Sequence, residues 1–145
     1  MEEHFEEFAA LISVVHGDIQ KLKTRAAARL GLKPVHIFWL YLLRMYPEGM
    51  SASELAAAGK HDRSLVSREL DWLLKENVVY TPDSGERRRY GWKLKLTEKG
   101  EELADAIAGI ARDVQTTVSR TIPPEELAIF YRTLHTLADE FEAIT

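Results

Sequence analysis

The sequence contains no cysteine among its 145 residues. Disulfide bonds, thiolate nucleophiles and cysteine-based redox sensors are therefore excluded. No apolar run approaches the ~20 residues that a membrane-spanning helix needs. The acidic start, Met1-Glu2-Glu3-His4, also lacks the basic and then apolar order of a signal peptide. We expect a cytoplasmic protein with no membrane association.

Motifs that support catalysis are missing as well. There is no glycine-rich phosphate loop and no His-Glu-x-x-His pattern, and the five histidines are scattered singly at 4, 16, 36, 61 and 135. We therefore expect no enzyme, no cofactor and no metal. Proline and glycine are scarce, at 5 and 8 residues, while 46% of the residues are hydrophobic. This composition is typical of one ordinary globular domain, which we assign to residues 1–145.

The net charge of −4 is unevenly distributed. Residues 60–95 hold nine Lys or Arg against six Asp or Glu, so the rest of the chain is strongly acidic. A basic surface on an acidic body is typical of a protein that binds nucleic acid. The alternative is an ordinary solvated surface, which charge alone does not exclude.

Three apolar stripes with alternating spacings of three and four residues predict long helices at the two ends of the chain. These helices are far apart in sequence and must come together within one subunit or between two. We interpret residues 1–31 and 98–145 as dimerisation helices, with a monomeric bundle as the alternative. The stripes are Phe5, Phe8, Ile12, Val15, Ile19 and Leu22, then Leu103, Ile107, Ile110, Val114 and Val118, then Leu127, Phe130, Leu134, Leu137, Phe141 and Ile144.

The pattern of residues 32–97 predicts a winged helix-turn-helix. Ser51 and Glu54 form a capping box for one short helix, and Asp62 is a good N-cap for the next. Strand-like runs at 78–80 and 90–96 flank a polar tip, as in a β-hairpin. The fold class is therefore mainly α with a small β-hairpin wing and terminal dimerisation helices.

Three blocks in this order resemble the MarR family of winged-helix transcription regulators over essentially the whole chain. The blocks are Ser53-Glu54-Leu55-Ala56, Asp62-Arg63-Ser64-Leu65-Val66-Ser67-Arg68 and Leu94-Lys95-Leu96-Thr97-Glu98-Lys99-Gly100. The resemblance implies a homodimer on a roughly palindromic operator of double-stranded DNA, often with a sensory pocket between the dimer and DNA-binding regions. Lys60 and His61 depart from the family pattern, which usually has a turn glycine and an apolar residue at these positions.

The helix that begins after Asp62 is predicted to enter the major groove. If Val66 and Leu70 face the core, its DNA-facing residues are Arg63, Ser64, Leu65, Ser67 and Arg68. Arg68 suits a guanine and Leu65 a thymine methyl, whereas the serines suit phosphates. The alternative for Arg68 is a surface pair with a neighbouring carboxylate or stacking on Trp72.

The wing carries Arg87, Arg88 and Arg89 in succession. A narrow minor groove concentrates negative potential and attracts an inserted arginine. We expect at least one of the three to enter it, and Lys93 and Lys95 to contact the DNA backbone. A solvated hairpin tip is the alternative.

A ligand pocket is predicted from His16, Arg25, His36, Trp39 and Tyr41, which combine aromatic surface with polar tips. Such a set suits a small aromatic or carboxylate effector, although aromatics at helical spacing also form cores. The predicted function is a homodimeric transcription regulator, acting as a repressor and modulated by a small ligand. The alternative is a dimerising winged-helix scaffold that binds a protein partner without reading DNA sequence.

Overall fold

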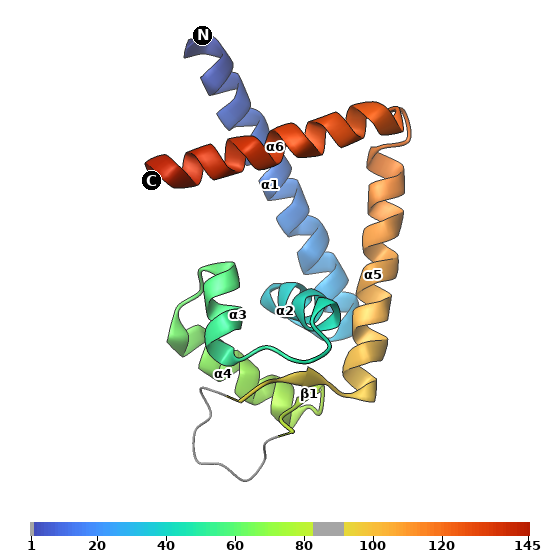
Figure 1. Cartoon of the computed structure of the whole chain (residues 1–145). Helices are drawn as coiled ribbons and strands as arrows, with labels where there is room; N and C mark the ends of the chain where they lie inside the picture. Colours follow the sequence, from blue (N-terminus) through green and yellow to red (C-terminus); the bar gives the residue numbers. More distant parts are fainter. Residues whose placement is uncertain (1, 83–91) are drawn as a thin grey trace. The chain divides into compact units, whose positions relative to one another are not determined.

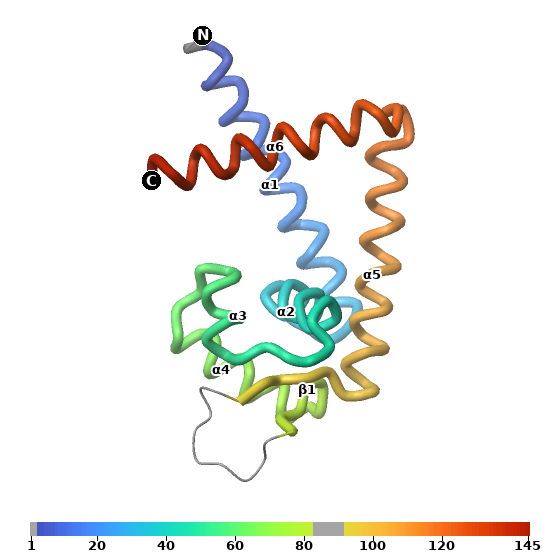
Figure 2. The backbone as a smooth tube through the Cα atoms, viewed as in Figure 1, coloured from blue at the N-terminus to red at the C-terminus, as the bar shows by residue number. Residues whose placement is uncertain are grey.

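The computed structural model describes residues 2–82 and 92–145 (Figures 1 and 2). The chain forms two compact units, Met1–Gly109 and Ile110–Thr145. The first unit contains α1 (Glu2–Leu30), α2 (Pro34–Met45), α3 (Ala52–Gly59), α4 (Arg63–Lys75), β1 (Val79–Tyr80), β2 (Lys95–Leu96) and the first half of α5 (Glu98–Val118). The second contains the rest of α5 and α6 (Pro124–Ile144). This mainly helical architecture with a small antiparallel sheet confirms the predicted fold class.

The helix starts follow the capping residues in the sequence. The Ser51 hydroxyl accepts the backbone N–H of Glu54 at 3.1 Å, and the Glu54 carboxylate accepts the N–H of Ser51 at 3.5 Å. The Asp62 carboxylate accepts the N–H of Leu65 at 2.8 Å, and the Thr97 hydroxyl accepts the N–H of Gly100 at 3.0 Å. Each bond satisfies a backbone donor that the first helical turn leaves without a partner.

Among the described residues 92–96 of the predicted strand, only Lys95–Leu96 form regular strand. Val79 pairs with Leu96 and Tyr80 with Lys95, in antiparallel register. Leu94 instead exchanges two backbone hydrogen bonds with Met50, in the linker between α2 and α3, at 2.8 and 3.2 Å. The backbone therefore changes partner within the segment, which ends the regular strand at β2. Residues 90 and 91 lie outside the described part of the chain.

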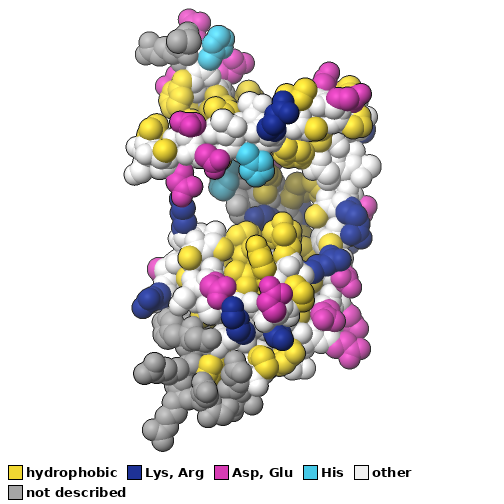
Figure 3. Space-filling model, in the orientation of Figure 1, with side chains coloured by type: hydrophobic (Ala, Val, Ile, Leu, Met, Phe, Trp, Pro, Cys, Tyr) yellow, Lys and Arg dark blue, Asp and Glu magenta, His cyan; other side chains and the backbone are white. Residues whose placement is uncertain are grey.

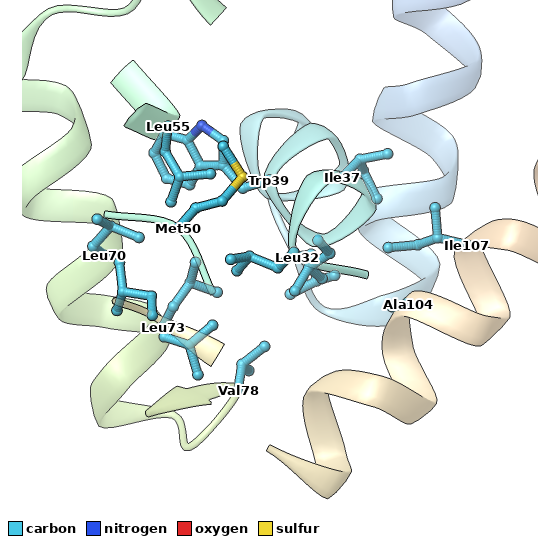
Figure 4. Close-up of a cluster of buried hydrophobic side chains, with 14 of the residues drawn as sticks. Leu32, Ile37, Trp39, Met50, Leu55, Leu70, Leu73, Val78, Ala104 and Ile107 are labelled. Atoms are coloured by element: carbon cyan, nitrogen blue, oxygen red, sulfur yellow. The ribbon is translucent and has the colours of Figure 1, made fainter. Parts of the chain in front are cut away.

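The core of the first unit surrounds α2 (Figure 4). Trp39, Leu40 and Leu43 are almost completely buried, and Leu73 of α4 is equally buried against them. Val66, Leu70 and Leu73 form the inward face of α4, as their spacing predicts. The first half of α5 adds Ala104 and Ile107. This packing fixes which face of α4 points to solvent.

Much of the apolar stripe of α1 is exposed, whereas the stripe of α5 contributes Ile107 to the core. The exposed apolar side chains of α1 include Phe5, Ile12, Val15, Ile19 and Leu22. In the second unit, α6 has no buried residue, and the Tyr131 hydroxyl donates to the Gln115 side chain at 3.3 Å. None of the helices in residues 2–82 and 92–145 has the length and apolar character that crossing a membrane requires.

Lys60 ends α3 in the left-handed conformation, with φ 53°. This left-handed backbone conformation costs a residue other than glycine roughly 1–2 kcal/mol. Glycine avoids that strain, but its unfolded chain has more conformational entropy to lose on folding, which offsets part of the gain. We expect Lys60→Gly to raise the free energy of unfolding by about 0.5–1 kcal/mol, measured by chemical denaturation. Asn77, at φ 60°, is the matched control. Asparagine visits this conformation at low cost, so Asn77→Gly should gain less; an equal gain would show that strain is not the cause.

Candidate nucleic-acid interface

The outward face of α4 presents polar and basic side chains. Arg63, Ser64, Ser67 and Arg68 are exposed, and with Asp71 they line a shallow concave surface. Leu65 is half-buried at the margin of this face. The structure thus gathers on one helix face the four exposed residues that the sequence assigned to the recognition helix.

Arg68 contacts a carboxylate on its own helix. Its Nε lies 3.7 Å from Glu69 Oε1, while the Arg68 side chain is 71% exposed. That separation is longer than a hydrogen bond and solvent screens the pair, so the attraction is weak. Arg68 therefore does pair with a neighbouring carboxylate, which was the alternative prediction for this residue. The pair leaves its guanidinium accessible to another anion.

The wing lysines have different surroundings. Lys93 Nζ lies 3.2 Å from Glu54 Oε1, and this hydrogen bond is the largest cause that lowers the pKa of the Glu54 carboxyl. Lys95 is half-buried beside Tyr80 and lines a polar groove. A phosphate that binds Lys93 would have to compete with Glu54. The predicted minor-groove residues Arg87, Arg88 and Arg89 lie outside the described residues.

Charges of both signs are interspersed around this region. The face drawn in Figure 3 shows Lys and Arg beside Asp and Glu, with no large area of one sign. Lys93 pairs with Glu54, which lies outside residues 60–95, at 3.2 Å. The basic excess of residues 60–95 is therefore partly neutralised locally.

Glu69 is a buried carboxylate on α4 that the sequence did not reveal. Its oxygens contact Lys33 Nζ and His36 Nε2, each at 2.9 Å, and Glu69 is 3% exposed. Burial tends to raise the pKa of the Glu69 carboxyl, but the hydrogen bonds from Lys33 and His36 outweigh it and the net shift is downward. Neither partner is close in sequence, so no local pattern could have identified the cluster.

The five predicted pocket residues do not share one environment. His36 and Trp39 are completely buried in the first unit, whereas His16, Arg25 and Tyr41 are exposed. Both ring nitrogens of His36 are engaged, by Lys33 N–H and by Glu69. A role for these residues in ligand binding stays a prediction. Trp39, with 0% exposure, is a core residue, which was the alternative prediction for the aromatic residues of this set.

A cavity of about 280 Å³ lies between α3, α4 and the segment before β2. Its apolar wall includes Ala56, Leu70 and Leu94, and its polar rim includes Arg63 and Ser67. Sequence patterns did not predict it, because it arises where three separate elements meet. Two residues of the rim are also candidates for DNA contact.

None of the family models and none of the characterised proteins compared with the sequence matches it. Solved structures do match. A MarR transcriptional regulator from Methanosarcina mazei is 20% identical, covers 97% of this chain and 99% of its own, and has a TM-score of 0.78. MarR from Staphylococcus aureus in complex with salicylate and kanamycin is 15% identical, covers 99% and 96%, and has a TM-score of 0.82. A MepR mutant from S. aureus bound to an oligodeoxyribonucleotide is 18% identical, covers 92% and 97%, and has a TM-score of 0.61. The chain therefore has the fold of MarR-family transcription regulators.

Proposed function

We propose that this chain, which has the fold of the MarR-family regulators, is a homodimeric transcription regulator that reads a pseudo-palindromic DNA operator and represses transcription. The observation that carries the proposal is the outward face of α4, where Arg63, Ser64, Ser67 and Arg68 are exposed together. A neighbour with this fold, the MepR mutant, was solved with an oligodeoxyribonucleotide.

The geometry of α4 suits the major groove. Asp62 caps its start, and the buried Leu70 and Leu73 anchor its second half in the core. The N-terminal half can therefore enter the groove while the C-terminal half holds it in place. Arg68 would bond to guanine and Ser64 to phosphate, so that base reading and positioning come from the same helix face.

Dimerisation is supported by the exposed stripe of α1. Val15 is 51% exposed and Ile12 43%, and apolar surface in contiguous stripes is seldom left in water. A second copy of the chain would cover it with an identical stripe under two-fold symmetry. The two copies of α4 would then read half-sites about one helical turn, ~10 bp, apart.

Modulation by a small aromatic or carboxylate effector completes the proposal. The cavity between α3 and α4 is of a size for one small molecule, and its rim includes Arg63 and Ser67. A ligand there would compete with DNA for the same side chains. S. aureus MarR, with the same fold, was solved with salicylate.

The deciding experiment is selection of binding duplexes from a random library at ~150 mM salt, followed by anisotropy titration of the enriched sequence. We expect an inverted repeat whose affinity falls steeply with salt. Arg68→Ala should weaken specific binding by ~1–3 kcal/mol and relax the preference at one base position.

Lys75→Ala is the matched control, because it removes the same charge from the last turn of α4. It should change affinity little and leave the base preference intact. Enrichment of no sequence, with no binding at low salt, would refute the regulator. That result would favour the alternative, a dimerising winged-helix scaffold for a protein partner.

A further inference from the structure

Glu69 is a charged residue on the buried face of α4, next to the exposed residues of the outward face. It directly follows Arg68, yet its side chain points into the protein and is only 4% exposed. A buried carboxylate without partners would be strongly destabilising. Lys33 Nζ and His36 Nε2, each at 2.9 Å, supply those partners from the start of α2. The Glu69 carboxylate thus connects α4 to the start of α2 and fixes how α4 is oriented against it.

The hydrogen bonds determine the protonation state of His36. Its Nδ1 lies 3.0 Å from the backbone nitrogen of Lys33. A backbone N–H can only donate, so Nδ1 must accept and carry no proton. The ring proton is therefore on Nε2, where it donates to the Glu69 carboxylate. A second proton would have to sit on Nδ1, directly facing the N–H of Lys33.

A ring contact also connects α2 to α4. The His36 imidazole stacks on Trp72 of α4, with ring centroids 5.0 Å apart and planes 10° apart. Glu69 and Trp72 are three residues apart and share one face of the helix. His36 therefore contacts α4 at two successive positions on that face, which restricts rotation of the helix about its axis.

We propose that Lys33, His36 and Glu69 form a positioning clamp for the recognition helix, and that the clamp requires a neutral His36, so that sequence-specific DNA binding weakens in acid. The DNA part rests on the proposed function. The clamp sets the rotation of α4 and thereby the direction in which Ser67 and Arg68 point. None of its three residues needs to touch DNA.

The sign of the pH dependence follows from where the proton binds. Burial is the main cause that lowers the pKa of His36 below its ordinary 6.5, opposed by the attraction of Glu69 and aided by the charge of Lys33. A released His36 takes up a proton near pH 6.5, whereas the clamped one does not. The clamp is therefore fully stable above that pH and loses stability as the pH falls below it. The lowered pKa of Glu69 gives a further loss below its ordinary value of 4.5.

The first arm of the test needs no DNA. Hydrogen exchange of the α4 amides, corrected for intrinsic rates, is followed between pH 7.5 and 5.5 by NMR, together with the His36 ring nitrogens. We expect protection to fall by up to about tenfold over this range, because the opened state gains a proton with an ordinary pKa. His36→Gln retains an N–H donor but cannot titrate, so it should abolish the fall. His4→Gln, at an exposed position of α1, should not.

The second arm measures the ratio of affinities for the selected duplex and a scrambled duplex. At pH 7.5, Glu69→Ala should reduce this ratio about tenfold, while Glu69→Gln, which retains an acceptor for His36, should preserve most of it. The Glu69→Ala protein must be shown to be folded by circular dichroism. If Glu69 were needed only for stability, the folded variant would keep the wild-type ratio of affinities. The wild-type ratio should also fall towards pH 5.5, but that of His36→Gln should not.

Several outcomes would overturn the clamp. One is a proton on His36 Nδ1 at neutral pH, and another is an unchanged ratio in folded Glu69→Ala. A third is an acid effect that disappears in His61→Gln instead, since His61 lies against the other neighbour of His36, Trp39, at 5.8 Å between rings. An exchange result as expected, with no duplex selected, would leave the helix clamp standing and refute the regulator and the DNA part of the proposal.

Discussion

Gly100→Ala is expected to lower the free energy of unfolding by about 3 kcal/mol, at the upper end for overpacking a core. Gly100 is buried in the first turn of α5, and a β-carbon there would overlap the carbonyl oxygen of Val78. That carbonyl cannot easily move, because it accepts the backbone N–H of Thr97 at 3.1 Å. The start of α5 and the residue before β1 would have to separate. Urea denaturation followed by circular dichroism measures the loss.

Gly17→Ala is the matched control for this prediction. Gly17 also lies within a helix, but a β-carbon at this position meets nothing within 4 Å. It is on the side of α1 opposite to Val15 and Ile19, so the proposed dimer contact is not affected. Alanine should stabilise the helix by about 0.5–1 kcal/mol. A Gly100→Ala protein as stable as the wild type would show that the contact between α5 and Val78 is looser than the structure indicates.

The second large effect is expected from Ile19→Glu in α1. Ile19 is 43% exposed in the single chain and lies in the middle of the stripe that we propose to be covered by a second copy. An isologous interface would receive the new carboxylate twice, without a partner charge. The dimer dissociation constant should rise at least ~100-fold, since each buried unpaired charge costs several kcal/mol. Sedimentation equilibrium at micromolar concentration measures the change.

Gln20→Glu adds the same charge at the adjacent residue, away from the stripe, and should remain dimeric. The Ile19→Glu monomer should keep its helical content, because this side chain is not part of the core of the first unit. It should also lose affinity for an inverted repeat while retaining weak binding to one half-site. A dimer that survives Ile19→Glu would exclude this stripe from the interface.

Local patterns predicted those parts of the fold that depend on near neighbours in sequence. The capping box of Ser51 and Glu54 and the N-cap of Asp62 can be recognised from residues three positions apart, and the structure contains both. The spacing of Val66 and Leu70 likewise identified the buried face of α4. Helix starts and inward faces are therefore predictable from sequence, because the interactions that set them are local.

The interactions that shape the candidate site are not local. Glu69 looks like any surface carboxylate in the sequence, and only the approach of Lys33 and His36 from α2 explains its burial. His36 was assigned to a ligand pocket, yet both of its nitrogens are occupied. Lys93 pairs with Glu54, which is 39 residues away. Such long-range charge pairs have no periodicity, so sequence patterns could not indicate them.

The bridge between Met50 and Leu94 has a mechanical consequence. Both backbone groups of Leu94 are bonded to Met50, which lies one residue before the capping Ser51 of α3. The Lys93–Glu54 pair adds a side-chain tie between the same two segments. A displacement of the segment that leads into β2 would therefore pull directly on the start of α3. We expect the segment around Leu94 and the start of α3 to move together when a duplex binds.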